Sequence, residues 1–301
     1  MSKTRLRSAD YSINEISKLS SYKSYTSIYD FKVMLKKSIR DLHKLGYKVG
    51  DIKGLKTKHV FKLVELWKEE QKSSATIKNY LSKFRELGNI LSNDRLVKPD
   101  NKPYNLEKRK YYPTENKAIF NPDLTKCADP LIKLSIEGQH LFGLRREEAI
   151  KFNLKEASRG DNNHLTLSPS WTKGGIGRMI PIRTKEQIEW IEKVREEVNF
   201  GSSLIPENKS YVEQLSKYSY QTELMGLSKL HGLRHAYAQN RYNELTSFYD
   251  SNKKGWKSPV NGGIKQNMMS TEERNIDFKV RNIITREMGH SRLAILKTYL
   301  G

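Results

Sequence analysis

The chain has 301 residues, 36% of them hydrophobic, enough to bury the core of one large domain or two ordinary ones. Its 55 Lys and Arg against 34 Asp and Glu give a formal charge of +21, more than solubility requires. Cys127 is the only cysteine, which excludes an intrachain disulfide and a multi-cysteine zinc site, and no apolar run predicts a membrane span or a signal peptide. We therefore expect a cytoplasmic protein with a polyanionic partner.

The basic excess is concentrated in the first third of the chain. Residues 1–110 hold 26 basic and 12 acidic side chains, a balance of +14, which leaves +7 for the remainder. Nucleic-acid phosphates attract such a surface, and the attraction falls with salt as counterions are released. Binding to double-stranded DNA would place the protein on the nucleoid.

Three apolar patterns with helical spacing predict a small bundle, over residues 29–45, 60–67 and 77–91. We expect residues 1–28 to form a basic arm and residues 29–112 a helical DNA-binding domain with its linker. Residues 95–114 are polar and contain three prolines, as in an extended linker. Candidate phosphate contacts, against the alternative of an ordinary solvated face, are Lys78, Lys83 and Arg85 on the third helix and Lys108, Arg109 and Lys110 in the linker.

The remaining part, 113–301, mixes helices with two short strands. A helix over 130–142 should stop at Gly143 and restart at Arg145. Alternating residues at 164–167 and 179–182, separated by a Gly-rich run, predict a β-hairpin. Capping boxes at 184–187 and 210–213 should each open a helix. We expect an α+β fold, mainly helical, with a small antiparallel sheet.

Four separated segments carry chemistry that none of them would indicate alone. They are Gly-Leu-Arg-Arg-Glu-Glu at 143–148, Thr-Lys-Gly at 172–174, His-Gly-Leu-Arg-His at 231–235, and Gly-His at 289–290 followed by Thr-Tyr at 298–299. In this order, and with a tyrosine nine residues after His290, the set resembles the tyrosine recombinase family, the phage integrases. The resemblance covers about Thr76 to Tyr299 and implies the DNA breaking-rejoining fold of that family.

Each residue type in this set suits transfer of a phosphodiester to a tyrosine. Arginine forks match phosphate oxygens and stay charged, a lysine can protonate the leaving 5′-oxygen, and tyrosine, with an ordinary pKa of about 10, needs a base. We expect Arg145 and Arg234 to bind the phosphate and His290 to donate a hydrogen bond to it. Tyr299 would be the nucleophile, His231 its general base and Lys173 the general acid. Glu148 would orient Arg145 or a histidine.

Two conditions follow from this scheme. Nine residues turn a helix through about 900°, which would put His290 and Tyr299 on opposite faces, so the helix must break between them. The cationic side chains supply the charge that Mg²⁺ gives other nucleases, and the covalent 3′-phosphotyrosyl link conserves the bond energy. We therefore expect no metal, no cofactor and no ATP.

The chain departs from the family pattern in two places. His290 follows Arg234 by 56 residues, about 30 more than usual, and we place an insertion at 247–275, either a contacting loop or a tolerated surface insertion. The sequence also stops at Gly301, where many relatives continue into a helix that packs on a neighbouring protomer. What holds Tyr299 must then be the chain's own body, its insertion or a neighbour.

The leading hypothesis is a site-specific recombinase of a phage or other mobile element, acting as a homotetramer on two synapsed DNA sites. Accessory directionality or DNA-bending proteins are further expected partners. The alternatives are a type IB topoisomerase, with nearly the same catalytic groups, and a DNA-binding regulator that has lost the reaction. A serine recombinase lacks support in the N-terminal sequence, and scattered carboxylates alone do not exclude a metal-dependent transposase.

Overall fold

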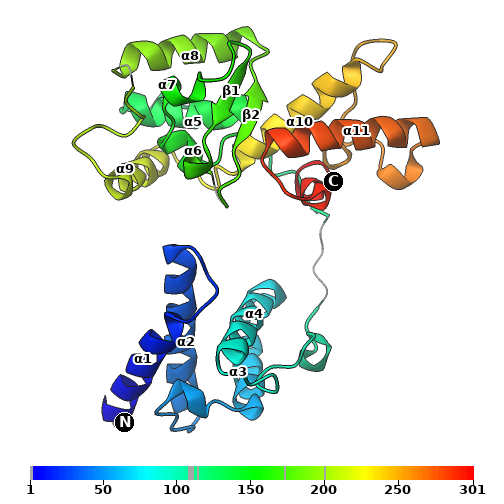
Figure 1. Ribbon diagram of the computed structural model, residues 1–301. Coiled ribbons are helices and arrows are strands. Elements are labelled where there is room, and N and C mark those ends of the chain that lie inside the picture. Colours follow the sequence, from blue (N-terminus) through cyan, green and yellow to red (C-terminus); the bar gives the residue numbers. More distant parts are fainter. Residues whose placement is uncertain (1–2, 108–111, 114, 173, 200) are drawn as a thin grey trace. The chain divides into compact units, whose positions relative to one another are not determined.

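A computed structural model describes residues 3–107, 112–113, 115–172, 174–199 and 201–301. The chain divides into two compact units, Met1–Lys110 and Tyr111–Gly301 (Figure 1). This division lies two residues before the boundary we placed between 112 and 113. Among the described residues, no helix has both the length and the apolar character needed to cross a membrane.

The first unit is a helical bundle. Helices α2, α3 and α4 cover the three predicted patterns, except that Leu45 and Leu91 are the residues after α2 and α4. The hydroxyls of Ser24 and Ser73 cap the starts of α2 and α4. Their apolar stripes face one core, in which Phe31, Trp67 and Phe84 are buried. The elements are α1 (Lys3–Ser17), α2 (Tyr25–Lys44), η1 (Ile52–Gly54), α3 (Thr57–Glu69), α4 (Ser74–Ile90) and η2 (Lys102–Tyr104).

The N-terminal residues differ from the expected arm. Helix α1 packs along α2 and buries Ala9, Ile13 and Ile16 in the core of the bundle. The hydroxyl of Ser12 also accepts a hydrogen bond from the backbone N–H of Ile52, at 3.0 Å. The prediction of a separate arm over 1–28 was wrong, because the apolar residues of this stretch complete the bundle.

The second unit is mainly helical and contains a two-stranded sheet. Strand β1 pairs antiparallel with β2, and His164 lies opposite Pro181. Both predicted capping boxes are formed, at Thr184–Gln187 and Ser210–Glu213. Its first elements are α5 (Pro130–Phe142), α6 (Arg146–Ile150), α7 (Leu154–Ala157), β1 (His164–Leu167), η3 (Pro169–Trp171), β2 (Arg178–Pro181), α8 (Lys185–Glu197) and α9 (Tyr211–Leu224).

The last third of the chain completes this unit. Helix α5 packs against α6, α8 and α10, and α10 packs in turn against α11. The remaining elements are α10 (Gly232–Ser247), η4 (Pro259–Asn261), η5 (Gln266–Met268), α11 (Thr271–Glu287), η6 (Leu293–Leu296) and α12 (Lys297–Leu300). The predicted insertion, 247–275, thus falls on the last residue of α10, on residues 248–270 with the turns η4 and η5, and on the start of α11.

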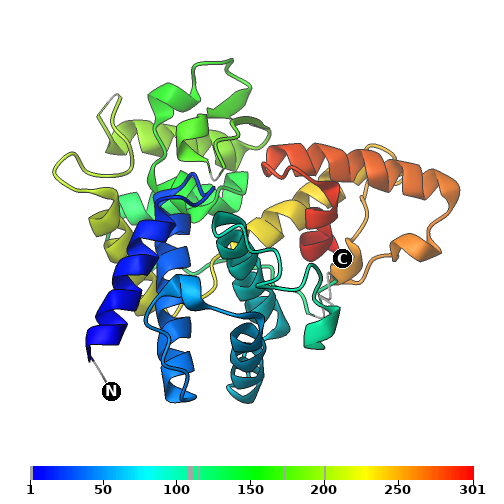
Figure 2. The same ribbon diagram turned by 60° about the horizontal axis from the view of Figure 1, so that its bottom comes forward.

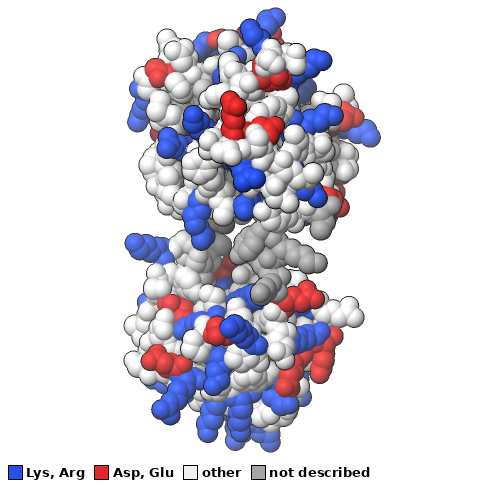
Figure 3. All heavy atoms as spheres, turned by 90° about the vertical axis from the view of Figure 1, so that its right-hand side faces the viewer, with Lys and Arg blue, Asp and Glu red and all other residues white. Residues whose placement is uncertain are grey.

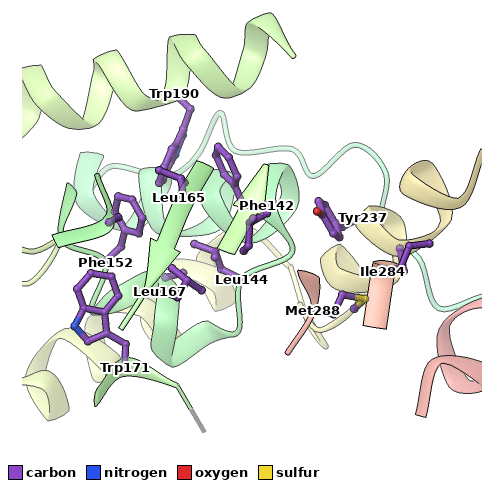
Figure 4. Close-up of a cluster of buried hydrophobic side chains, with 14 of the residues drawn as sticks. Phe142, Leu144, Phe152, Leu165, Leu167, Trp171, Trp190, Tyr237, Ile284 and Met288 are labelled. Atoms are coloured by element: carbon purple, nitrogen blue, oxygen red, sulfur yellow. The ribbon is translucent and has the colours of Figure 1, made fainter. Parts of the chain in front are cut away.

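The core of the second unit joins the hairpin to the helices on both sides of it. Leu165 and Leu167 of β1 belong to one buried cluster with Trp190 of α8 and Phe142 of α5, and Tyr237, Ile284 and Met288 extend the cluster to α10 and α11 (Figure 4). The indole N–H of Trp190 donates to the carbonyl of Leu134, at 3.0 Å, so this buried donor is satisfied. This packing fixes the ends of α5, β2, α10 and α11 relative to one another.

Candidate active site

As predicted, His290 and Tyr299 do not lie on one continuous helix, although the helix ends before His290 and not between the two residues. Helix α11 ends at Glu287, the 3₁₀ turn η6 follows, and α12 carries Tyr299 back against α10 (Figure 1). The hydroxyl of Tyr299 lies 2.8 Å from Nε2 of His231, at the N-terminal end of α10. The tyrosine itself is 4% exposed, so its ring is fixed by packing.

Three histidine rings surround that tyrosine. The ring centroids of His235, His290 and His231 lie 4.5, 5.4 and 5.6 Å from the centroid of Tyr299. His231 and His235 are four residues apart and so share one face of α10. The Nε2 atom of His290 is buried and has no hydrogen-bond partner among the described residues, which leaves it available to a ligand.

Burial and nearby arginines keep these histidines neutral. Burial, and then the charges of Arg234 and Arg145, lower the pKa of His231 to about 4 and that of His290 to about 3. The pKa of His235 is lowered to about 4, chiefly by burial and by His231. At neutral pH, His231 therefore has a free electron pair that can accept the proton of the Tyr299 hydroxyl.

A buried carboxylate binds two arginines next to this group. Nη1 of Arg145 donates to Oε1 of Glu148 at 2.7 Å, and both Nη atoms of Arg178 bind the same carboxylate at 2.9 and 2.7 Å. Burial alone would raise the pKa of Glu148, but Arg178, Arg234 and the N–H of Arg145 lower it to about 2. The carboxylate is therefore ionised and fixes both guanidinium groups.

The C-terminal end of α11 brings three arginines together. Nε of Arg178 donates to the carbonyl of Glu287 at 2.7 Å, Nη2 of Arg234 to that of Met288 at 3.0 Å, and Nη2 of Arg145 to that of Gly289 at 2.8 Å. These carbonyls lack helical partners and form the negative end of the helix dipole, which favours cations there. The helix end thus aligns the two predicted phosphate-binding arginines.

Arg234 is almost completely buried, and two of its three guanidinium nitrogens are hydrogen-bonded within the described residues. Its Nη1 donates to the carbonyl of Gly143, whereas Nε has no partner among the described residues. Burial lowers the pKa of Arg234 to about 10, so the side chain remains charged at neutral pH. A charged donor left unpaired in such a place can bind an anionic oxygen.

The structure thus brings six of the seven predicted site residues together: Arg145, Glu148, His231, Arg234, His290 and Tyr299. The seventh, Lys173, lies outside the described residues. Of the predicted DNA contacts, Lys78 donates to the carbonyl of Glu107, Arg85 donates to Asn101 at 2.8 Å, and Lys83 is half-buried. Lys108, Arg109 and Lys110 also lie outside the described residues, and DNA contact by these six remains a prediction.

Sequence reasoning missed Arg178, and it assigned no role to His235 although that residue closes the 231–235 motif. Arg178 precedes Ile180 by two residues, so both lie on the buried face of β2, where a guanidinium requires an acidic partner. This alternation along β2 could have indicated an ion pair between Arg178 and an acidic residue, although it could not have indicated Glu148 in particular. His235 could have been found from its four-residue spacing after His231.

Two family models match the chain: "phage integrase, N-terminal" over residues 8–96 and "integrase" over residues 109–240. The chain belongs to the tyrosine recombinase family, the phage integrases. Arg145, Arg178 and Arg234 lie in the second matched range, whereas His290 and Tyr299 lie beyond it. No curated protein sequence matches the chain.

Solved integrases share this fold. A lambda integrase dimer bound to a COC′ core site matches with a TM-score of 0.54 and 14% identity, over 81% of this chain and 73% of that one. A lambda integrase tetramer on a Holliday junction matches with a TM-score of 0.55 and 14% identity, over 79% and 74%. The Tn1549 transposon integrase with circular intermediate DNA matches with a TM-score of 0.55 and 12% identity, over 97% and 95%.

Proposed function

We propose that this integrase is a site-specific recombinase in which Tyr299 attacks the scissile phosphate of DNA. Its oxygen forms a bond to phosphorus, the bond to the 5′-oxygen breaks, and the DNA remains attached as a 3′-phosphotyrosyl ester. The 2.8 Å contact between the Tyr299 hydroxyl and Nε2 of His231 carries this proposal, because it joins the nucleophile to a neutral base.

The proton and charge transfers are assigned to the surrounding residues. His231 takes the tyrosine proton, and Arg145, Arg234 and His290 stabilise the charge on the non-bridging oxygens. Lys173 protonates the departing 5′-oxygen, a role that rests on the motif alone. Attack of a 5′-hydroxyl on the phosphotyrosine reverses each step and reseals the strand, so the reaction needs neither ATP nor a metal.

The physiological partner in this proposal is double-stranded DNA of a phage or another mobile element. Each chain supplies one nucleophile, and the exchange of strands between two duplexes requires four cleavages. A homotetramer on synapsed DNA meets that requirement, with accessory proteins to bend the DNA or set the direction. The lambda tetramer on a Holliday junction is an assembly of this kind in a protein of the same fold.

Sequencing of covalent adducts tests the function. The protein is incubated with fragmented DNA from its source cells in EDTA, denatured, and the DNA linked to it is sequenced. A recombinase returns one recurrent site or a few. Adducts at unrelated sequences, with relaxation of any supercoiled plasmid, would instead indicate a topoisomerase, and the absence of adducts would indicate a DNA-binding regulator.

A further inference from the structure

The 248–270 segment, between α10 and α11, is anchored to the second unit at both ends. The backbone N–H of Trp256 donates to the Thr246 hydroxyl at 2.7 Å, and the indole packs against the main core. Near the other end, Nε2 of Gln266 donates to Asp277 of α11 at 2.5 Å. These contacts give the segment a defined position.

Between the anchors, this segment lies against the C-terminal turn that carries Tyr299. The turn η4 contacts α12, and a β-carbon placed on Gly301 would lie 2.9 Å from the nitrogen of Val260 and 3.1 Å from Cβ of Pro259. Figure 2 shows the C-terminus beside this part of the chain. These contacts join α12 to the 248–270 segment.

A chain of amide side chains links the same segment to the backbone of Tyr299. Nδ2 of Asn116 lies 3.4 Å from Oδ1 of Asn261 and 3.2 Å from Oε1 of Gln239. Nε2 of Gln239 donates in turn to Oδ1 of Asn116, at 2.8 Å, and to the carbonyl of Tyr299, at 3.2 Å. The carbonyl of the nucleophile is therefore connected to residue 261 through two side chains.

We propose that the 248–270 segment is a clamp that holds Tyr299 in the active site of its own chain. The inference rests on the proposed function, since it gives the additional residues between Arg234 and His290 a role in that reaction. Asn261, Asn116 and Gln239 are then positioning residues, and Pro259 and Val260 are the surface on which the C-terminal turn rests. Cleavage proceeds with this contact intact.

A reversible cross-link tests whether the contact is kept during cleavage. Cys127 is the only native cysteine, so a Cys127→Ser background with Pro259→Cys and Gly301→Cys can form one defined disulfide. The two β-carbons, 3.1 Å apart, need only separate by about half an ångström to reach disulfide geometry. The rate of adduct formation is measured, on a duplex carrying the recovered site, for the oxidised and the reduced form of the same protein.

The clamp predicts that the oxidised form cleaves within about twofold of the reduced form. Loss of cleavage on oxidation, restored by a reductant, would mean that the turn must leave this surface, and would overturn the proposal. The reduced form of the same protein shows separately whether the chain cleaves DNA. If the proposed function is wrong, neither form cleaves; if only the clamp is wrong, the reduced form cleaves and the oxidised form does not.

A pair of matched substitutions in the segment tests the amide chain. Asn261→Ala should lower the cleavage rate at saturating DNA about fivefold or more, with the DNA concentration at half-saturation unchanged, because a misplaced nucleophile loses rate and not affinity. Asn252→Ala, also exposed in this segment, should leave both values within about twofold. Equal cleavage rates for the two variants would contradict the positioning role.

Discussion

Glu148 organises the site by binding two guanidinium groups on one buried carboxylate. The sequence could indicate Glu148 as a partner of Arg145, because the two are three residues apart at the start of a helix. It could not indicate Arg178, which is 30 residues away and meets Glu148 only when β2 packs against α11. Contacts of that kind depend on tertiary packing, which a short motif does not encode.

Replacing Arg178 should therefore impair cleavage without touching the nucleophile. Arg178→Lys keeps the charge but loses the two-pronged contact, and we expect the cleavage rate to fall about 10- to 100-fold, with Arg145 less firmly placed. Arg281→Lys is the matched control, because Arg281 is also buried and binds Asp277, not the carboxylate that Arg145 shares. Equal rates for the two folded variants, measured by adduct formation, would refute the role of Arg178.

The histidines around Tyr299 should make the protein sensitive to acid. Their folded-state pKa values of about 3 to 4 lie below the unfolded value of about 6.5, so the unfolded chain binds more protons in this range. Stability should fall as the pH drops from about 6.5 toward 4, with a loss in Tm of roughly 5 °C between pH 7 and pH 5. Calorimetry should show a smaller loss for His290→Asn, and an identical loss would argue against a buried neutral His290.

At the scale of secondary-structure elements, the ends of helices determine where the residues of the site lie. The sequence predicted where α5 stops, because glycine favours the left-handed conformation that Gly143 adopts, with φ at +60°. It could not predict that the ring of Tyr237 packs on this glycine, or that Arg234 binds its carbonyl. Local sequence rules therefore predicted that α5 ends at Gly143. The contacts of Gly143 with Tyr237 and Arg234 depend on tertiary packing, which these rules do not describe.

Gly143→Ala should destabilise the fold for two reasons: the left-handed backbone conformation of Gly143 and the Tyr237 ring packed against it. An added β-carbon would lie 2.6 Å from the Tyr237 ring, and we expect a loss of about 3 kcal/mol or more in the free energy of unfolding. Gly226 has a similar φ of +68° with no atom near its β-carbon position, so Gly226→Ala should cost only about 1 kcal/mol. Urea unfolding that gave equal losses would show that the contact with Tyr237 is unimportant.

At the scale of the whole molecule, charge and chemistry are distributed unequally over the sequence. The first unit carries most of the basic excess, and Lys and Arg are prominent on the surface in Figure 3. The proposed catalytic residues all belong to the second unit. The sequence predicted this division and the fold class, but the prediction for residues 1–28 was wrong. The apolar pattern there is too short to distinguish a helix that packs in the bundle from an exposed arm.

DNA binding should therefore depend strongly on salt. If the basic excess meets phosphates, a plot of log affinity against log salt concentration should have a slope of about −5 or steeper, as expected for six or more phosphate contacts. Fluorescence anisotropy with a duplex of arbitrary sequence measures it between 50 and 200 mM salt, on the order of physiological ionic strength. A slope near zero would show that the charge is not used for DNA.

The identity of the residue that bears DNA after cleavage tests the central claim most directly. Adducts formed on a nicked duplex are digested with nuclease and protease, and the peptide that retains a nucleotide is sequenced by mass spectrometry. We expect the nucleotide on Tyr299, and we expect Tyr299→Phe to form no adduct although it binds the same DNA. A nucleotide on any other residue, or an adduct that survives in Tyr299→Phe, would contradict the account.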